Sequence, residues 1–281
     1  MTRVERAGLT LIRTVLGARL AGRIAAGYRR GARRRAETIG YVWSTRGRAS
    51  RRHLEALRGR YAGERCFIIG NGPSLALTDL APLRDEFTFA LNRGYLLYER
   101  LGRPSTFLVA VNRHVIDQFG KEIVTAAGDT FVSWHSRDLL ERTADVTYIR
   151  STEGPRFSSD VANDGVWEGA TVTYVALQLA FHMGFRQVVL IGVDHAFATA
   201  GPPHTLIVSE GPDPNHFDSS YFGKGVRWQL PDLETSEIAY RLARDRFERD
   251  GRSIVDATIG GKLRIFERVD YSQVTGGARS S

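Results

Sequence analysis

The chain has 281 residues, of which 42% are apolar; this suffices for one sizeable α/β domain with an appendage and excludes a wholly disordered chain. Its single cysteine, Cys66, excludes an internal disulfide and a cysteine-rich zinc site. The chain has a net charge of +8, which is unevenly distributed: residues 1–60 contain 16 Arg, no Lys and 3 Glu, a balance of +13, and residues 61–281 have a balance of −5. We therefore expect no nucleic-acid binding by residues 61–281.

Residues 1–60 are expected to form a basic helical N-terminal arm. A helix is predicted over residues 7–28, because apolar residues recur there at spacings of three and four, and an arginine-rich run follows over residues 28–35. Two interpretations stay open: a helix that is solvated or bound to a partner, and a peripheral anchor on an anionic membrane surface. We see no bilayer-spanning run and no signal-peptide pattern, so we expect a cytoplasmic protein, attached under the second interpretation to the inner face of the cell membrane.

Residues 61–270 alternate short apolar runs with helical stretches, and the Gly/Ser-rich residues 271–281 are expected to form a flexible tail. The alternation predicts βαβ units and hence an α/β fold with a doubly wound, mostly parallel Rossmann-like sheet. Helices are expected over residues 171–183 and 233–249, and strands over residues 65–70, 87–92, 106–112, 130–135, 146–149, 187–193 and 253–256.

The first expected strand runs into a glycine-rich loop, residues 70–75. Glycines let the backbone approach a ligand closely, and successive N–H groups at a helix start bind phosphate. The loop is not a P-loop, because no Gly-Lys-Ser/Thr follows, and Leu75 stands where a Rossmann fingerprint has its third glycine. A purely structural tight turn is the alternative. We predict nucleotide binding by four residues of this loop: Gly70, Asn71, Gly72 and Ser74.

Five further candidates stand at strand ends or at a helix start, where open α/β sheets bind their ligands. Asn92 and Asn112 each end a strand and offer donors and acceptors to a base, a ribose or a sugar. Gly169 and Thr171 open a helix and suit an anion, although Thr171 is equally compatible with an ordinary N-cap. Asp194 ends another strand, beside the base candidate His195, and suits a ribose or a metal.

The long polar connection over residues 196–230 is expected to be a lid, since connections of this length in a compact domain are usually functional. It holds three candidate catalytic residues: His216 as base or acid, Tyr221 as a hydrogen-bond donor to phosphate, and Lys224 as a cation. A structural loop histidine is the alternative for His216. The chain has no Gly-x-Ser-x-Gly, no His-Glu-x-x-His and no Asp-x-Asp at a strand end, which argues against hydrolase and zinc chemistry.

Several of these motifs occur together in one known family. The segments 68–75, 169–197 and 215–221, with Gly261-Lys262-Leu263, resemble the MptE-like family, named for the archaeal 6-hydroxymethylpterin diphosphokinase, over roughly residues 60–270. A more distant similarity links the Asn-Gly-Pro-Ser-Leu loop and the strand-ending asparagines to the bacterial sialyltransferases that build lipooligosaccharide. That similarity implies that the loop and asparagines hold the CMP moiety, that His216 is the base, and that Tyr221 assists the leaving phosphate.

Three functions follow from these patterns. The first is a metal-independent glycosyltransferase, without a cofactor, that joins a CMP-linked sugar donor to a glycan acceptor in cell-surface glycan synthesis. The second is a diphosphokinase that moves pyrophosphate from ATP to a pterin alcohol and needs Mg²⁺, for which Asp194, Asp213 and Asp218 are candidate ligands. The third is a non-catalytic nucleotide-binding partner in surface-polysaccharide assembly.

Overall fold

The computed structural model describes residues 31–32, 35–142, 145–199 and 201–275, and the chain divides into two compact units at Arg48. The helix predicted over residues 7–28 lies outside the described residues. The second unit begins at Ala49, within helix α3 (Thr45–Leu57), and the buried side chains of Leu54 and Leu57 belong to its hydrophobic core.

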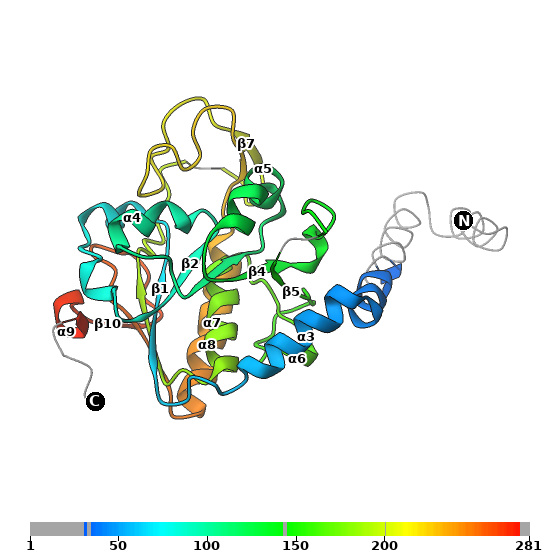
Figure 1. Cartoon of the computed structure of the whole chain (residues 1–281). Helices are drawn as coiled ribbons and strands as arrows, with labels where there is room; N and C mark the ends of the chain where they lie inside the picture. The colour runs from blue at the N-terminus through cyan, green and yellow to red at the C-terminus, as the bar shows by residue number, and fades with distance from the viewer. Residues whose placement is uncertain (1–30, 33–34, 143–144, 200, 276–281) are drawn as a thin grey trace, which may run out of the picture. The chain divides into compact units, whose positions relative to one another are not determined.

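The second unit is built on an eight-stranded sheet in which every neighbouring pair is parallel (Figure 1). This confirms the predicted doubly wound α/β class. The strand order is β10-β9-β6-β1-β2-β3-β4-β5. The strands are β1 (Arg65–Ile69), β2 (Phe87–Leu91), β3 (Phe107–Ala110), β4 (Asp129–Ser133), β5 (Thr147–Ile149), β6 (Gln187–Ile191), β9 (Ser253–Asp256) and β10 (Glu267–Arg268).

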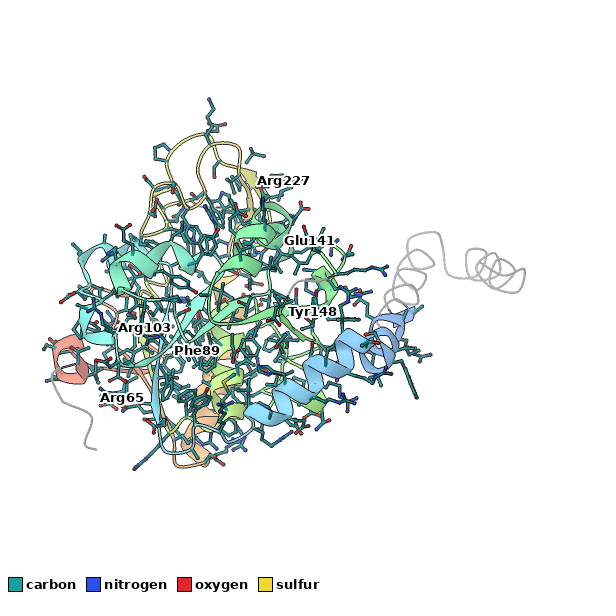
Figure 2. The ribbon with its side chains drawn as sticks, in the orientation of Figure 1. Arg65, Phe89, Arg103, Glu141, Tyr148 and Arg227 are labelled. Carbon is teal, nitrogen blue, oxygen red and sulfur yellow. The ribbon has the colours of Figure 1, made fainter. Side chains whose placement is uncertain are left out.

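The strands are continuous apolar runs because both faces of a parallel sheet are covered. In β1, Cys66 and Ile68 point into one core cluster, and Phe67 and Ile69 point into the other. Phe89 of β2 lies inside the sheet region in Figure 2 and packs 4.5 Å, between ring centroids, from Phe107 of β3. Side chains that alternate along the central strands therefore pack against helices on both faces of the sheet.

Different helices cover the two faces of the sheet. The cluster around Cys66 contains residues of α3, α7 (Val172–Met183) and α8 (Leu233–Arg249). The opposite cluster contains residues of the short elements η1 (Pro73–Leu77), η2 (Ala81–Leu83), η3 (Gly94–Leu97) and α4 (Tyr98–Leu101). The remaining elements are α5 (Arg113–Thr125), η4 (Trp134–Ser136), α6 (Val161–Asp164) and α9 (Tyr271–Thr275).

The sheet has its topological switch point between β1 and β6. The chain steps from β1 outward to β5 on one side, and then from β6 outward to β10 on the other. At such a point the loops after two adjacent strands diverge, which opens a crevice at the carboxyl edge. Here those loops begin at Gly70 and Gly192.

The predicted lid contains a small hairpin, β7 (Leu206–Val208) paired with β8 (Arg227–Gln229), which the sequence had not indicated. Arg227, labelled in Figure 2, donates to Asp117 of α5 at 2.8 Å, and its backbone N–H donates to Gln118. The lid is thus fastened to α5 by polar contacts. Within the described ranges, no helix is both long and apolar enough to cross a bilayer.

Candidate functional site

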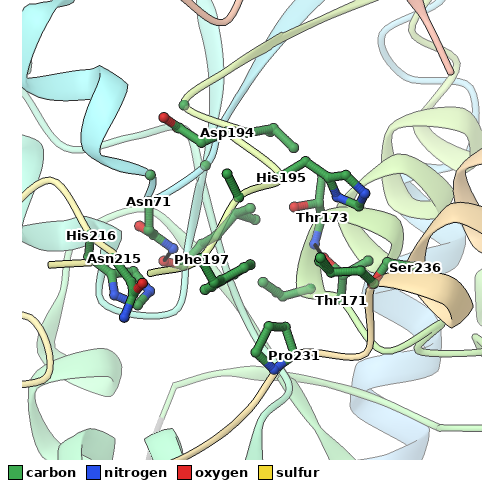
Figure 3. A pocket seen from close by; sticks show the side chains of 18 of the residues that line it. Asn71, Thr171, Thr173, Asp194, His195, Phe197, Asn215, His216, Pro231 and Ser236 are labelled. Atoms are coloured by element: carbon green, nitrogen blue, oxygen red, sulfur yellow. Dashed lines mark hydrogen bonds between the residues drawn. The ribbon is translucent and has the colours of Figure 1, made fainter. Parts of the chain in front are cut away.

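A pocket opens at the carboxyl ends of β1, β2 and β6, at the switch point (Figure 3). Its walls come from the loops after these strands, the start of α7, the lid and the first turns of α8. The predicted site residues that line it are Gly70, Asn71, Gly72, Asn92, Thr171, Asp194 and His216. Its other polar lining residues are Thr173, His195, Asn215, Ser236 and Tyr240.

The glycine-rich loop is held against the loop after β6. The Gly72 N–H donates to the Gly192 carbonyl at 2.9 Å, and the backbone N–H and hydroxyl of Ser74 donate to the Asp194 carboxylate at 3.1 and 2.7 Å. Ser74 does not line the pocket, so its contribution is to fix Asp194. Both carboxylate oxygens of Asp194 already accept hydrogen bonds from the protein, which leaves this residue a supporting part of the wall.

The two asparagines after β1 and β2 present unused acceptors. Asn71 donates its amide to the Leu91 carbonyl at 3.1 Å, which fixes the orientation of the side chain. The Oδ1 atoms of Asn71 and Asn92 are both buried, and neither has a hydrogen-bond partner in the described part of the chain. A buried acceptor without a partner costs free energy unless a ligand supplies the donor. The pair therefore suits hydroxyl or amino groups of a ligand.

Backbone strain is concentrated at this pocket. Of the four non-glycine residues described with a left-handed φ, three line it: Asn92 at 51°, Ala170 at 58° and His195 at 53°. Asparagine and histidine are enriched among the non-glycine residues that adopt this conformation, but alanine is disfavoured in it by about 1 kcal/mol or more. Such residues persist where the surrounding structure fixes them, and they are typical of ligand sites.

The start of α7 forms another part of the wall. Thr171 is the N-cap, and its hydroxyl accepts from the Thr173 N–H at 3.3 Å and lies 3.3 Å from the Tyr240 hydroxyl. Gly169 does not line the pocket. A Cβ there would lie 2.6 Å from Ala239, so glycine is required by the packing of α7 and α8.

His216 is oriented by a buried carboxylate. Its Nδ1 donates to Asp213 Oδ2 at 2.7 Å, and the Asp213 side chain is only 3% exposed. Because a carboxylate only accepts, Nδ1 carries the proton and Nε2 is left as the basic nitrogen. The imidazole also stacks on the Tyr221 ring at 4.1 Å between centroids. This arrangement matches a general base with its orienting group.

The lid segment that carries His216 is fixed to the glycine-rich loop. The Phe217 N–H donates to the Asn71 carbonyl at 3.0 Å. Arg93, directly after Asn92, donates to the Ser220 carbonyl at 2.9 Å and to the Tyr221 carbonyl, and its guanidinium lies 3.9 Å from the Phe119 ring. The base and the two asparagines are therefore held in one connected framework.

Besides Ser74 and Gly169, three more predicted residues lie outside the pocket wall. Asn112 is the N-cap of α5, and its side chain accepts from the N–H groups of His114 and Val115. Tyr221 is 1% exposed, its hydroxyl accepts from the Arg93 N–H, and burial raises its pKa. Lys224 is exposed and is not part of the pocket wall. The first two therefore have structural contacts that the sequence did not indicate.

Nothing in the sequence indicated that α8 forms part of the pocket wall. Ser236 and Tyr240 stand four positions apart, on the helix face that reaches the pocket. They looked like ordinary positions of an amphipathic helix. A signal for Asp213 was present, because Asp213 and His216 are three residues apart, but the sequence offered the aspartate only as a metal ligand.

The three carboxylates considered for Mg²⁺ do separate tasks. Asp194 accepts from Ser74, Asp213 accepts from His216 and two backbone N–H groups, and Asp218 accepts from the N–H and hydroxyl of Ser220. Within the part of the chain that the structure describes, no three His, Cys, Asp or Glu residues lie close enough together to hold a metal ion by themselves. Each of the three carboxylates accepts hydrogen bonds from its own neighbours in the protein.

Comparison with known proteins gave few matches. No protein-family model matches the chain, and no curated protein matches it. Among solved structures, the chain is similar to the MAf glycosyltransferase from Magnetospirillum magneticum AMB-1, with 18% sequence identity and a TM-score of 0.47. The match covers 80% of this chain and 38% of that one, so the chain spans well under half of its length. The likeness to the MptE-like family stays a prediction.

Proposed function

We propose that the protein is a metal-independent glycosyltransferase that uses a nucleotide-linked sugar, most simply a CMP-linked one, and transfers it to a glycan hydroxyl in cell-surface glycan synthesis. The observation that carries this proposal is His216, which faces the pocket with its Nδ1–H donated to the buried Asp213. The unpartnered oxygens of Asn71 and Asn92 in the same pocket support a ligand rich in hydroxyl and amino groups.

In the proposed reaction, His216 Nε2 takes the proton from the acceptor hydroxyl. A bond forms between the acceptor oxygen and the anomeric carbon, while the bond from that carbon to the phosphate oxygen breaks and the phosphate leaves with its electron pair. Asp213 stabilises the imidazolium that forms. The lid excludes water, which would otherwise compete as the acceptor. For the diphosphokinase alternative, Mg²⁺ would arrive with the ATP phosphates, and the candidate ligands Asp194, Asp213 and Asp218 each accept hydrogen bonds from the protein.

The test is thermal stabilisation by a nucleotide panel: CMP, CDP, UDP, GDP and ATP, each with Mg²⁺ and with EDTA. A ligand at about 100 times its dissociation constant adds roughly 2.7 kcal/mol of stability, or several degrees in Tm at this size. We expect a shift with CMP or CDP that persists in EDTA. A shift only with ATP and Mg²⁺ would favour the diphosphokinase, and no shift with any nucleotide would remove the proposal.

The arginine-rich arm would place this enzyme beside lipid-linked acceptors. We expect the full chain to co-sediment with vesicles that contain anionic lipid, and a chain lacking residues 1–35 to stay in the supernatant, because each arginine near an anionic surface adds about 1 kcal/mol. Neutral vesicles are the control. Equal sedimentation of both chains would exclude the membrane tether.

A further inference from the structure

His195 is a second histidine in the pocket, and its backbone conformation is unusual. It follows β6 after Gly192, Val193 and Asp194, and its φ of 53° is uncommon for a residue other than glycine. The loop after β6 turns here so that the imidazole enters the pocket wall. The proposed function assigns no task to this side chain.

The His195 side chain is oriented by a carboxylate on α8. Its Nε2 lies 3.3 Å from Glu237 Oε1 on α8, and its side chain is only 10% exposed. Arg241 donates to the other oxygen of Glu237 at 2.7 Å, which fixes the carboxylate. The Tyr240 ring packs edge-on at 6.2 Å between centroids, and the Asp194 carboxylate next in the chain is bonded to Ser74.

One nitrogen of the imidazole is left for a ligand. Nε2 faces the acceptor oxygen of Glu237 and therefore carries a proton. Nδ1 has no hydrogen-bond partner among the residues that the structure describes. When Nδ1 is also protonated, Glu237 stabilises the imidazolium, and the Nδ1–H becomes a charged donor that faces the pocket.

The polar groups are divided between two sides of the pocket. Figure 3 shows Asn71 and His216 on one side and His195, Thr171 and Ser236 on the opposite side. The asparagine side offers unpartnered acceptor oxygens. The opposite side offers the hydroxyls of Thr171 and Tyr240, which lie 3.3 Å apart, and the His195–Glu237 pair, whereas the Ser236 hydroxyl is donated to the Asp232 carbonyl. A ligand with an uncharged polar part and an anionic part would fit in one orientation, with the uncharged part beside the asparagines and the anionic part beside His195.

We propose that His195, held by Glu237, binds the phosphate of the nucleotide, and that the uncharged part of the ligand faces Asn71 and Asn92. This deepens the proposed function and rests on it for the identity of the ligand. It also gives the two histidines separate tasks, with His216 on the acceptor hydroxyl and His195 on the leaving phosphate.

The test measures binding of cytidine, CMP and inorganic phosphate by calorimetry to the full chain and to His195→Asn. Asparagine tolerates a left-handed φ and stays uncharged, so the substitution removes the cation without added backbone strain. We expect CMP affinity to fall about tenfold or more, phosphate binding to be lost, and cytidine affinity to remain. The matched control is His204→Asn, because His204 has φ 63° and pairs with Asp232 at 3.2 Å but does not line the pocket.

Each outcome separates the two proposals. If His195→Asn binds CMP as the wild type does, or loses cytidine and CMP equally, the phosphate assignment is wrong although the nucleotide site stands. If the wild type binds phosphate through His195 but binds neither cytidine nor CMP, the assignment stands and the CMP-linked donor is excluded. If the wild type binds none of the three, both proposals are overturned.

Discussion

Replacing His216 by alanine is expected to lower the rate of glycosyl transfer by about 10²- to 10⁴-fold, the usual contribution of a positioned general base. Nucleotide affinity should be unchanged, because the base acts on the acceptor and not on the nucleotide. The measurement is the rate of CMP release from a CMP-linked sugar in the presence of acceptor, together with the Kd for CMP. An unchanged rate would exclude His216 as the base.

The Asp213→Asn variant tests the orienting group without removing the base. Asp213 Oδ2 accepts from both His216 Nδ1 and the Phe222 N–H, and Oδ1 accepts from the Asn215 N–H. An amide cannot satisfy all three donors, so we expect the imidazole to lose its orientation and the rate to fall as well. His53→Gln is the control, because His53 also lies near an aspartate, Asp129 at 3.6 Å, but lines no part of the pocket.

Replacing Gly70 by alanine is expected to destabilise the fold by about 3 kcal/mol and to abolish nucleotide binding. An added Cβ would lie 2.2 Å from the Gly192 carbonyl oxygen and 2.6 Å from its carbon. That carbonyl cannot move freely, since it accepts a hydrogen bond from the Gly72 N–H at 2.9 Å. Gly70 is also fixed, because its N–H donates to the Ile191 carbonyl at 2.8 Å. The substitution therefore separates the loops after β1 and β6.

Denaturant unfolding and Tm measure this effect, and a fall in Tm of about 6–12 °C is expected for this size. Gly211→Ala is the matched control, because a Cβ at Gly211 would meet no heavy atom within 4 Å. We expect the control to remain within about 0.5 kcal/mol of the wild type. Equal unfolding midpoints for the two variants would show that the close approach of the loops is not required.

Seven of the eight strands of the sheet were predictable, because they appear as largely apolar runs, whereas the edge strand β10 was missed, because both of its residues are charged and exposed. The helix Leu233–Arg249 and the strand Ser253–Asp256 have the predicted bounds. Helix α5 was missed. Its apolar residues Val115, Ile116, Phe119 and Ile123 do recur at helical spacing, but Phe119 interrupts the helix with a non-helical φ of −131°. The predicted strand over residues 106–112 ends at Ala110, because Asn112 leaves the sheet to cap α5.

Sequence reasoning could identify residues of the candidate site only where they follow a single strand directly. Asn92 and Asn112 each follow a strand and look alike in the sequence. In the structure Asn92 lines the pocket, whereas Asn112 caps helix α5. Tyr221 looked like a polar lid residue, yet its ring packs beneath His216. The wall from α8 could not be predicted, because which face of a helix meets a pocket depends on tertiary packing.

The single thiol in the chain, Cys66, lies fully buried in β1 between β2 and β6, and burial raises its pKa well above its ordinary value. A buried thiol at the centre of the sheet reacts with an alkylating or disulfide reagent only when the sheet opens. The rate of its labelling thus reports opening of the strands that carry the glycine-rich loop. A ligand held at the ends of β1 and β6 would slow that rate, so the unaltered protein carries its own probe of occupancy.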